Sequence, residues 1–346
     1  MFAIERLLAV VILITGLAAK AWADPSGGSL PANVMRGIPA DARADVALIN
    51  SDGSVSGSAS TARGLTTPAS TGDVYRNDAG DVVSIPKWLP FSDARGFGRG
   101  GTGIAIVKDK QTGPFHAVYS MPGYSFEEAD VYLPSDRVRP PEIFVHRPGS
   151  TDTVYVYLGG QSSTGGAVDA GFQHSPSRDN WALFIICEGF SFHVSSGARF
   201  AAGQTARLRF FVPADNYVAV SATGRDVDGR QVTRTVVLDV SRYPSTEPPA
   251  PLGRGGEPTH FTWTASGQGD ILKRMTSIAQ HRQSWTTQSF IKGIHWTNVR
   301  IGTSGEDLHR WRSADQSEDV DWPDTTHIVV DERTPDDETV DILLDR

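Results

Sequence analysis

The chain of 346 residues contains one cysteine, Cys187, so no disulfide can form within it. It also lacks any Asn-x-Ser/Thr acceptor for N-linked glycans. Without disulfides, the folded chain has to be stabilised by apolar burial, and Cys187 lies in an apolar run that is typical of a buried small side chain. For a protein that the next paragraph predicts to be exported, these two absences favour a bacterial origin.

Long apolar runs are absent except at the N-terminus. Residues 1–23 combine a short first segment that ends at Arg6, an apolar segment at 7–19, and the Ala-x-Ala cleavage pattern of Ala21 and Ala23. The apolar segment is shorter than the ~20 residues that a membrane-spanning helix needs. The sequence therefore predicts a cleaved signal peptide, a secreted protein, and no membrane partner after cleavage.

A basic stripe is also absent. The net charge is −8, and residues 314–346 alone hold twelve acidic and two basic residues. Proteins that bind nucleic acid normally show clustered positive charge, so we expect no nucleic-acid partner. We expect a solvated acidic tail from about residue 314, with a partner-binding or calcium-responsive tail as the alternative.

The pattern that is present is strand-like alternation in the middle of the chain. Val154, Val156 and Leu158 alternate with Tyr155 and Tyr157, which is the period of a strand with two different faces. Residues 167–173 alternate in the same way, and residues 181–187 are apolar on both faces, as in a central strand covered on both sides. These three runs predict an antiparallel meander inside a β-sandwich.

The remaining segments extend this prediction to an all-β chain. Residues 24–82 are rich in Gly, Ser and Ala and are predicted to form a flexible leader. Residues 83–346, with about ten strands separated by turns, are predicted to form one antiparallel jelly roll. One short helix is predicted at 271–280, with Asp270 as its N-cap and Met275 and Ile278 on one face.

A long meander, aromatic strands and a short helix in a late connection together resemble the concanavalin A-like lectin and glucanase jelly roll. The resemblance covers residues 83–344 and rests on the layout of the elements. It implies a carbohydrate ligand.

Catalytic motifs are incomplete. Glucanases of this architecture carry Glu-x-Asp-x-x-Glu on one strand, and here Glu128 and Asp130 are followed by Leu133 where the last acid belongs. Polysaccharide lyases use Gln-x-His, whereas Gln173 and His174 are adjacent and therefore point to opposite faces of a strand. We predict no catalytic residue from these patterns, and whether the protein is an enzyme stays open.

Polar and aromatic side chains on predicted strands form the candidate binding surface, because sugars are held by aromatic rings and by amide and carboxylate hydrogen bonds. Trp296 and Asn298 are expected on one side of their strand, although Trp296 has core packing as its alternative. The carboxylate of Glu188 ends a strand and would be costly to bury. The predicted ligand-binding residues are Asp169, Gln173, Glu188, Arg207, Arg209, Trp296 and Asn298. For the two arginines the alternative is a structural ion pair with Glu188 or Asp169.

No metal-ligand set is predicted, since Asp226 and Asp228 form only a fragment of a calcium loop, and calcium is left open as a cofactor. The preferred hypothesis is an exported, non-catalytic, lectin-like sandwich that binds polysaccharide or cell-surface glycan. The alternatives are a secreted glycan-degrading enzyme of the same architecture and a structural or adhesive surface protein. The sequence leaves the oligomeric state undetermined.

Overall fold

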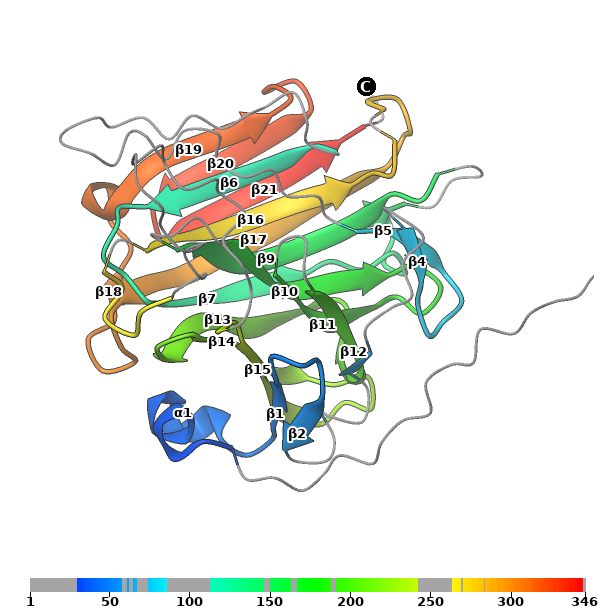
Figure 1. Ribbon diagram of the computed structural model, residues 1–346. Coiled ribbons are helices and arrows are strands. Elements are labelled where there is room, and N and C mark those ends of the chain that lie inside the picture. Colours follow the sequence, from blue (N-terminus) through cyan, green and yellow to red (C-terminus); the bar gives the residue numbers. More distant parts are fainter. Residues whose placement is uncertain are drawn as a thin grey trace, which may run out of the picture.

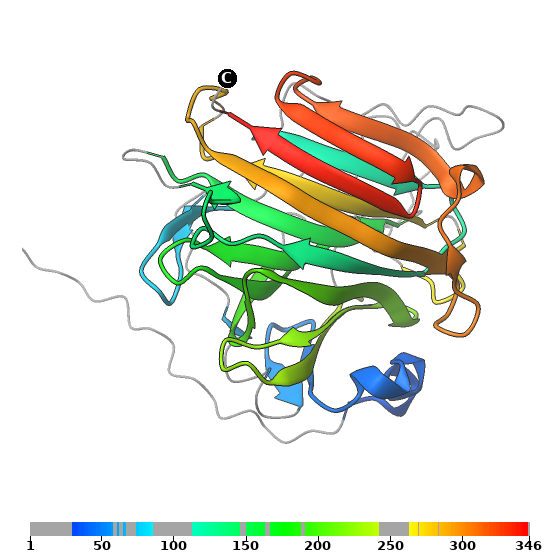
Figure 2. The same ribbon diagram turned by 180° about the vertical axis from the view of Figure 1, so that it is seen from behind.

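The computed structural model describes residues 30–57, 61, 65–66, 74–85, 113–145, 150–162, 167–187, 191–241, 263–268, 270–282 and 284–344. The predicted signal peptide at 1–23 and Glu188 lie outside these residues. Two large β-sheets, sheet A and sheet B, face each other, with sheet B in front in Figure 1 and sheet A in front in Figure 2. The predicted all-β sandwich is confirmed. In the part of the chain that the structure describes, no helix combines the length and apolarity needed to cross a membrane.

Sheet A has eleven strands. The main path is β2-β1-β15-β14-β13-β7-β17-β21-β20, and β8 and β18 both pair with β17. All described pairings in this sheet are antiparallel except that of β1 with β15. The strands are β1 Val46–Ile49, β2 Val55–Gly57, β7 Phe126–Leu133, β8 Ile143–Phe144, β13 Gln204–Ala214, β14 Tyr217–Arg225, β15 Gln231–Asp239, β17 Phe290–Gly302, β18 His309–Arg310, β20 Ile328–Thr334 and β21 Asp337–Leu343.

Sheet B has eight strands in the order β19-β6-β16-β9-β10-β11-β12-β3. These strands are β3 Leu65–Thr66, β6 Phe115–Ser120, β9 Thr153–Gln161, β10 Ala167–Ser175, β11 Asn180–Cys187, β12 Ser191–Ala201, β16 Ile271–Ala279 and β19 Gln316–Trp322. The smaller elements are the hairpin β4 Val74–Arg76 and β5 Val82–Ser84, the helix α1 Ala32–Gly37, and the single 3-10 turns η1 Ala40–Ala42 and η4 Ser313–Asp315.

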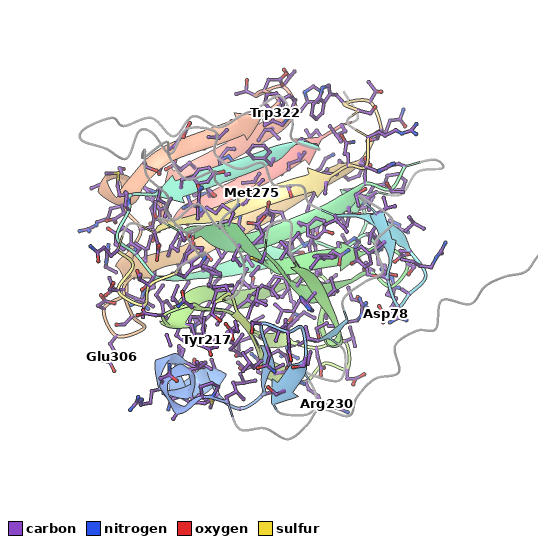
Figure 3. All side chains as sticks on the ribbon, in the orientation of Figure 1. Asp78, Tyr217, Arg230, Met275, Glu306 and Trp322 are labelled. Atoms are coloured by element: carbon purple, nitrogen blue, oxygen red, sulfur yellow. The ribbon has the colours of Figure 1, made fainter. Side chains whose placement is uncertain are left out.

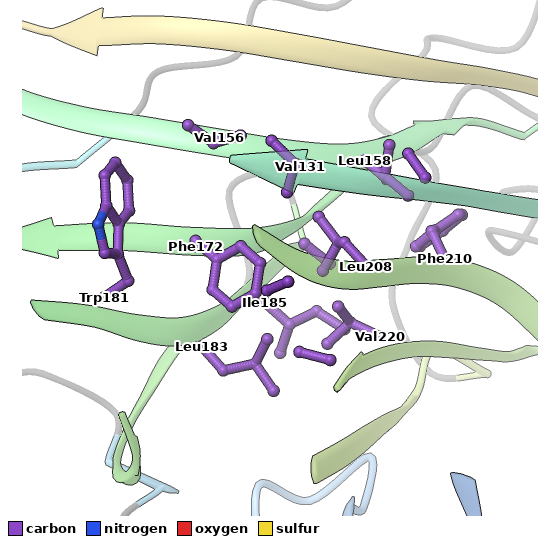
Figure 4. Packing of buried hydrophobic residues seen from close by; sticks show 14 of the residues in the cluster. Val131, Val156, Leu158, Phe172, Trp181, Leu183, Ile185, Leu208, Phe210 and Val220 are labelled. Carbon is purple, nitrogen blue, oxygen red and sulfur yellow. The ribbon is translucent and has the colours of Figure 1, made fainter. Parts of the chain in front are cut away.

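The core lies between sheets A and B. Alternate residues of β9, β10 and β11 point into it from sheet B, and alternate residues of β7, β13 and β14 point into it from sheet A (Figure 4). Phe172 and Leu208 are both completely buried there. Because side chains of a strand alternate between faces, one apolar set per strand is enough to fill the space between the sheets.

The central meander has the predicted form. Val156 and Leu158 join the inter-sheet core, whereas Tyr155 and Tyr157 pack in a separate cluster on the outer face of sheet B. Strand β11 is buried along its whole length, as predicted for a central strand. Cys187 is buried, which confirms its predicted place.

The predicted helix at 271–280 is wrong. These residues form β16, which pairs with β6 on one side and β9 on the other. The spacing of Met275 and Ile278 fits a helix, but Leu272 and Ile278 enter the core between the sheets as alternating strand residues. Two neighbouring strands and burial on both faces override the local helical spacing.

The leader was expected to be unstructured, and the described part of it is not. Strand β1 is buried throughout and pairs with β15, and α1 packs against β13. The one α-helix among the described residues is therefore in this segment. The acidic tail likewise contributes strands to both sheets, with β21 lying between β17 and β20. Its acidic residues alternate with apolar ones such as Val340 and Ile342, which are fully buried.

The core can be tested at Phe172, whose ring is completely buried and lies edge-on to Phe200 at 5.2 Å between centroids. We expect Phe172→Ala to lower the free energy of unfolding by about 3–5 kcal/mol, through lost burial and the cavity it leaves. Urea denaturation measures this. The control is Val227→Ala at a side chain that is 53% exposed, and equal effects of the two variants would contradict the assigned core.

Candidate functional site

A groove crosses the outer face of sheet A above β7, β13 and β17. Residues of β7 alternate here, with Ala129 and Val131 in the core and Glu128 and Asp130 on the groove side. The groove has a volume of about 460 Å³. Its lining consists of Glu128, Asp130, Arg207, Asn298, Arg300, Leu308, His309 and Arg310. We call it the sheet A groove.

The Asp130 carboxylate in the sheet A groove is held by two hydrogen bonds. Its Oδ1 accepts a hydrogen bond from Nε of Arg207 at 3.0 Å, and its Oδ2 accepts one from Nδ2 of Asn298 at 3.0 Å. Each partner comes from a neighbouring strand, β13 or β17. The carboxylate is therefore fixed from two sides while remaining at the surface, with lone pairs left for a ligand.

The position of Asn298 depends on a bulge in β17. The register of β17 against β7 shifts between Thr297 and Arg300, and Asn298 has a φ of +53°, in the left-handed region that asparagine tolerates better than most residues. The bulge breaks simple alternation, so Trp296 and Asn298 do not lie on the same side as expected. Trp296 is completely buried and donates its indole N–H to Oγ1 of Thr276 at 3.1 Å.

Arg209 lies beneath the sheet A groove, where it pairs with Glu128 of the lining. Its Nε donates to Oε2 of Glu128, and its Nη1 contacts both carboxylate oxygens of Asp41 at 2.9 Å. Arg207 and Arg209 thus point away from the core as predicted, and they pair with Asp130, Glu128 and Asp41. These hydrogen bonds fix the geometry of the groove floor. The alternative partner Asp169 binds Lys273 instead, and Glu188 lies outside the described residues.

Arginine guanidinium groups dominate the open part of the sheet A groove. The side chain of Arg310 is 75% exposed and lies 3.6 Å from Asp336, and that of Arg300 is 43% exposed and donates to the carbonyl of Leu308. The lining holds three arginines and two acidic residues. Exposed guanidinium donors suit carboxylate or sulfate groups, which they can bind in a bidentate manner.

The other predicted site residues lie elsewhere. Asp169 and Gln173 are on the outer face of sheet B, on the far side of the sandwich from the groove. Sequence reasoning missed Arg300 and Arg310, and it discarded Asp130 because Leu133 broke the glucanase motif. The alternation of Glu128 and Asp130 beside apolar Ala129 and Val131 was the signal for a polar strand face.

Asp169 forms a buried ion pair with Lys273. Their Oδ1 and Nζ atoms are 2.7 Å apart, and neither side chain is exposed. Gly159 of β9 is the register partner of both residues, and it carries no side chain to separate them. A Cβ at Gly159 would come within 2.1 Å of the Val168 carbonyl oxygen. Burial raises the pKa of Asp169 to about 6 despite the attraction of Lys273.

Gln173 helps to hold the β4–β5 hairpin against the outer face of sheet B. Its Oε1 accepts a hydrogen bond from the hydroxyl of Tyr75 on β4, and Tyr75 also packs edge-on against Phe192 of β12. The β4–β5 hairpin thereby closes over this end of the face. Asp78, which is labelled in Figure 3, lies in the turn of that hairpin. Its carboxylate forms ion pairs with Arg178 and Arg199.

A second set of ionisable groups is enclosed between the sheets. Arg274 donates to both carboxylate oxygens of Glu338, at 2.8 and 3.0 Å, and His116 lies 2.9 Å from Asp321. Burial alone would lower the pKa of His116, but hydrogen bonds to Asp321 and Glu338 raise it to about 9. Nearby, burial raises the pKa of Glu127 to about 8. The network is consistent with a structural role, since breaking one partner of such a network leaves a buried charge.

Comparisons with known proteins find solved structures that resemble this chain only at low similarity. No family model matches the chain, and no curated protein matches it. The chain is similar to the solved structure of scytalido-glutamic peptidase with a transition state analog inhibitor, at 8% identity and a TM-score of 0.36, covering 67% of this chain and 98% of that one. It is also similar to SCP-B, a member of the eqolisin family of peptidases, at 8% identity and a TM-score of 0.35 with the same coverage. At 8% identity, function has to be argued from this chain's own side chains.

The buried ion pair of Asp169 and Lys273 in sheet B can be tested by a double-mutant cycle. Lys273→Met leaves the Asp169 carboxylate buried without its cation, so we expect a loss of about 3–5 kcal/mol in the free energy of unfolding. The double variant Asp169→Val with Lys273→Met should recover most of this loss, because two apolar side chains need no compensation. Denaturant titration measures both, with Lys292→Met at an exposed lysine as the control. Strictly additive effects would contradict direct pairing.

The His116 network predicts a pH dependence of stability. The pKa of His116 lies above its unfolded value of 6.5, so the folded state binds the proton more tightly. The resulting stabilisation is complete below pH 6.5 and is lost as the pH rises through about 9. His116→Gln should flatten the fall in melting temperature across this window, whereas His281→Gln at an exposed histidine should not. If the melting temperature falls by the same amount in both variants, ionisable groups other than His116 cause the pH dependence.

Proposed function

We propose that the protein is an exported, lectin-like sandwich that binds a polysaccharide or cell-surface glycan in the sheet A groove. The observation that carries the proposal is Asp130, a surface carboxylate held by Arg207 and Asn298. A carboxylate, an amide and a guanidinium at one point can accept from and donate to neighbouring sugar hydroxyls. Export by residues 1–23 and kinship with the concanavalin A-like lectins are part of this proposal.

The charges of the sheet A groove favour an acidic glycan. Its three arginines, Arg207, Arg300 and Arg310, each lie within 4.0 Å of one carboxylate, those of Asp130, Glu128 and Asp336. Arg300 and Arg310 have exposed donors, and a uronate or sulfate group would form charge-assisted hydrogen bonds with them. Neutral sugars could still accept hydrogen bonds from the arginines, but without the charge assistance that a uronate or sulfate group adds.

A glycan-degrading enzyme is the second candidate, because Glu128 and Asp130 share the groove. Glycoside hydrolysis needs two carboxylates on either side of the scissile bond. Here both carboxylates project from β7 two residues apart, on one wall, and each is bound by an arginine. This arrangement favours binding over hydrolysis.

A glycan array with neutral and acidic polysaccharides tests the proposal. We expect acidic glycans to bind, and Asp130→Ala to weaken binding about tenfold or more, because hydrogen bonds to charged groups contribute ~1.5–3 kcal/mol. The matched control is Asp228→Ala, which removes an exposed aspartate paired with Arg230 in the turn between β14 and β15, away from the sheet A groove.

Two outcomes would contradict this proposal. Binding that Asp130→Ala leaves unchanged would move the site elsewhere, and the absence of binding to any glycan would favour a structural or adhesive role. A reducing-sugar assay on each bound glycan decides between the two candidates, since release of sugar would identify an enzyme. Binding of acidic glycans should also weaken as salt is raised, because salt screens the arginines.

A further inference from the structure

Three side chains that commonly bind metals meet at the end of the sandwich where β10 turns into β11. They are Asp136, in the connection between β7 and β8; His174, on β10; and Asp179, in the turn before β11. One ligand atom from each lies within 4.8 Å of the others. None of the three belongs to the sheet A groove.

The scaffold holds these side chains in place. The His174 ring lies 5.0 Å from the ring of Trp181, its register partner, and the indole N–H of Trp181 donates to the carbonyl of Pro134. Asp179 has a φ of +49°, and its Oδ2 accepts from the hydroxyl of Ser135 at 2.6 Å. Hydrogen-bonded carboxylates and packed imidazoles are what metal sites use to orient their ligands.

The distance between two of the ligand atoms matches that between two ligands of one zinc ion. Nε2 of His174 is 3.3 Å from Oδ1 of Asp179, which is long for a charge-assisted hydrogen bond at ~2.7–2.9 Å. Two ligands at ~2.0–2.1 Å from a tetrahedral zinc ion are separated by about 3.4 Å.

A cavity of about 310 Å³ adjoins two of the three side chains. Asp136 and His174 both line it, together with Asp81, Ile143, Phe144, Val145, Pro176 and Ser177. An ion held by three protein ligands would keep a coordination position for water or a small ligand, as open zinc sites do. The cavity provides space for it.

Charge also favours a cation here. Two of the three side chains, Asp136 and Asp179, are acidic, and their ligand atoms lie within 4.8 Å of each other. The Arg137 guanidinium lies 3.8 Å from Asp179, but it is 70% exposed and therefore screened by solvent. A divalent ion between the carboxylates would offset their repulsion.

We propose that Asp136, His174 and Asp179 bind one divalent transition-metal ion, with zinc as the best match. The imidazole selects against magnesium and calcium, which prefer oxygen ligands throughout. A second group of side chains, His116 with Asp319 and Asp321, also has ligand spacing. It is a poorer site because His116 also lies 3.5 Å from Glu338, which binds the Arg274 cation.

Calorimetric titration of zinc chloride into untagged, chelator-treated protein tests the site. We expect one zinc per chain, with calcium and magnesium binding at least about a hundredfold more weakly, since neither favours an imidazole ligand. Asp136→Asn should weaken zinc binding at least about tenfold, the loss that removing even an outer partner of a metal ligand causes. Among the described residues, the hydrogen bonds that hold this turn are accepted by Ser135 and Asp179 rather than by the Asp136 side chain, so this variant should fold.

Asp321→Asn is the matched control, because it removes the same group from the second cluster. Loss of zinc binding in Asp321→Asn but not in Asp136→Asn would overturn the proposal, as would the absence of zinc binding or tighter binding of calcium. The melting temperature gives an independent readout. Zinc should raise it in the wild type and in Asp321→Asn but not in Asp136→Asn, and equal shifts in all three proteins would also overturn the site.

Discussion

Apolar contact between the two sheets is the constraint on which the rest of this protein depends. With one buried cysteine and no possible intrachain disulfide, sheets A and B are joined through the side chains that alternate strands send into the space between them. A charged group in that space needs an oppositely charged partner beside it, as Arg274 has in Glu338. The same alternation sends the opposite side chains outward, and it thereby creates the polar floor of the sheet A groove.

The outer faces of the two sheets differ because their neighbours differ. On sheet A, acidic residues of β7 meet arginines of β13 and β17. The Asp130–Arg207 pair is partly exposed, whereas the Glu128–Arg209 pair is buried. On sheet B, the Asp169 and Lys273 side chains meet across Gly159 and are completely buried. Ion pairs of the same kind are therefore partly exposed on one side of the sandwich and completely buried on the other.

Period-2 runs made the fold class and the central meander predictable from sequence, since Val156, Leu158 and Phe172 alternate with polar or aromatic residues whatever their distant neighbours are. The strand at Ile271–Ala279 was not predictable in this way, because its helical spacing is overruled by pairing with β6 and β9, which lie far away in the chain. Only part of the sheet A groove could be predicted from the sequence. Arg207 followed from alternation, but the association of Asn298 with Asp130 depends on a bulge that local pattern does not specify.

The parallel pairing of β1 with β15 has a consequence for solubility. Strand β1 occupies the hydrogen-bonding edge of β15 that β14 leaves open. A chain that lost residues 30–57 would present the backbone N–H and C=O groups of β15 to solvent as a template for strand addition by another copy. The N-terminal segment thus covers this edge of sheet A. Forms of the protein that lack it are expected to self-associate.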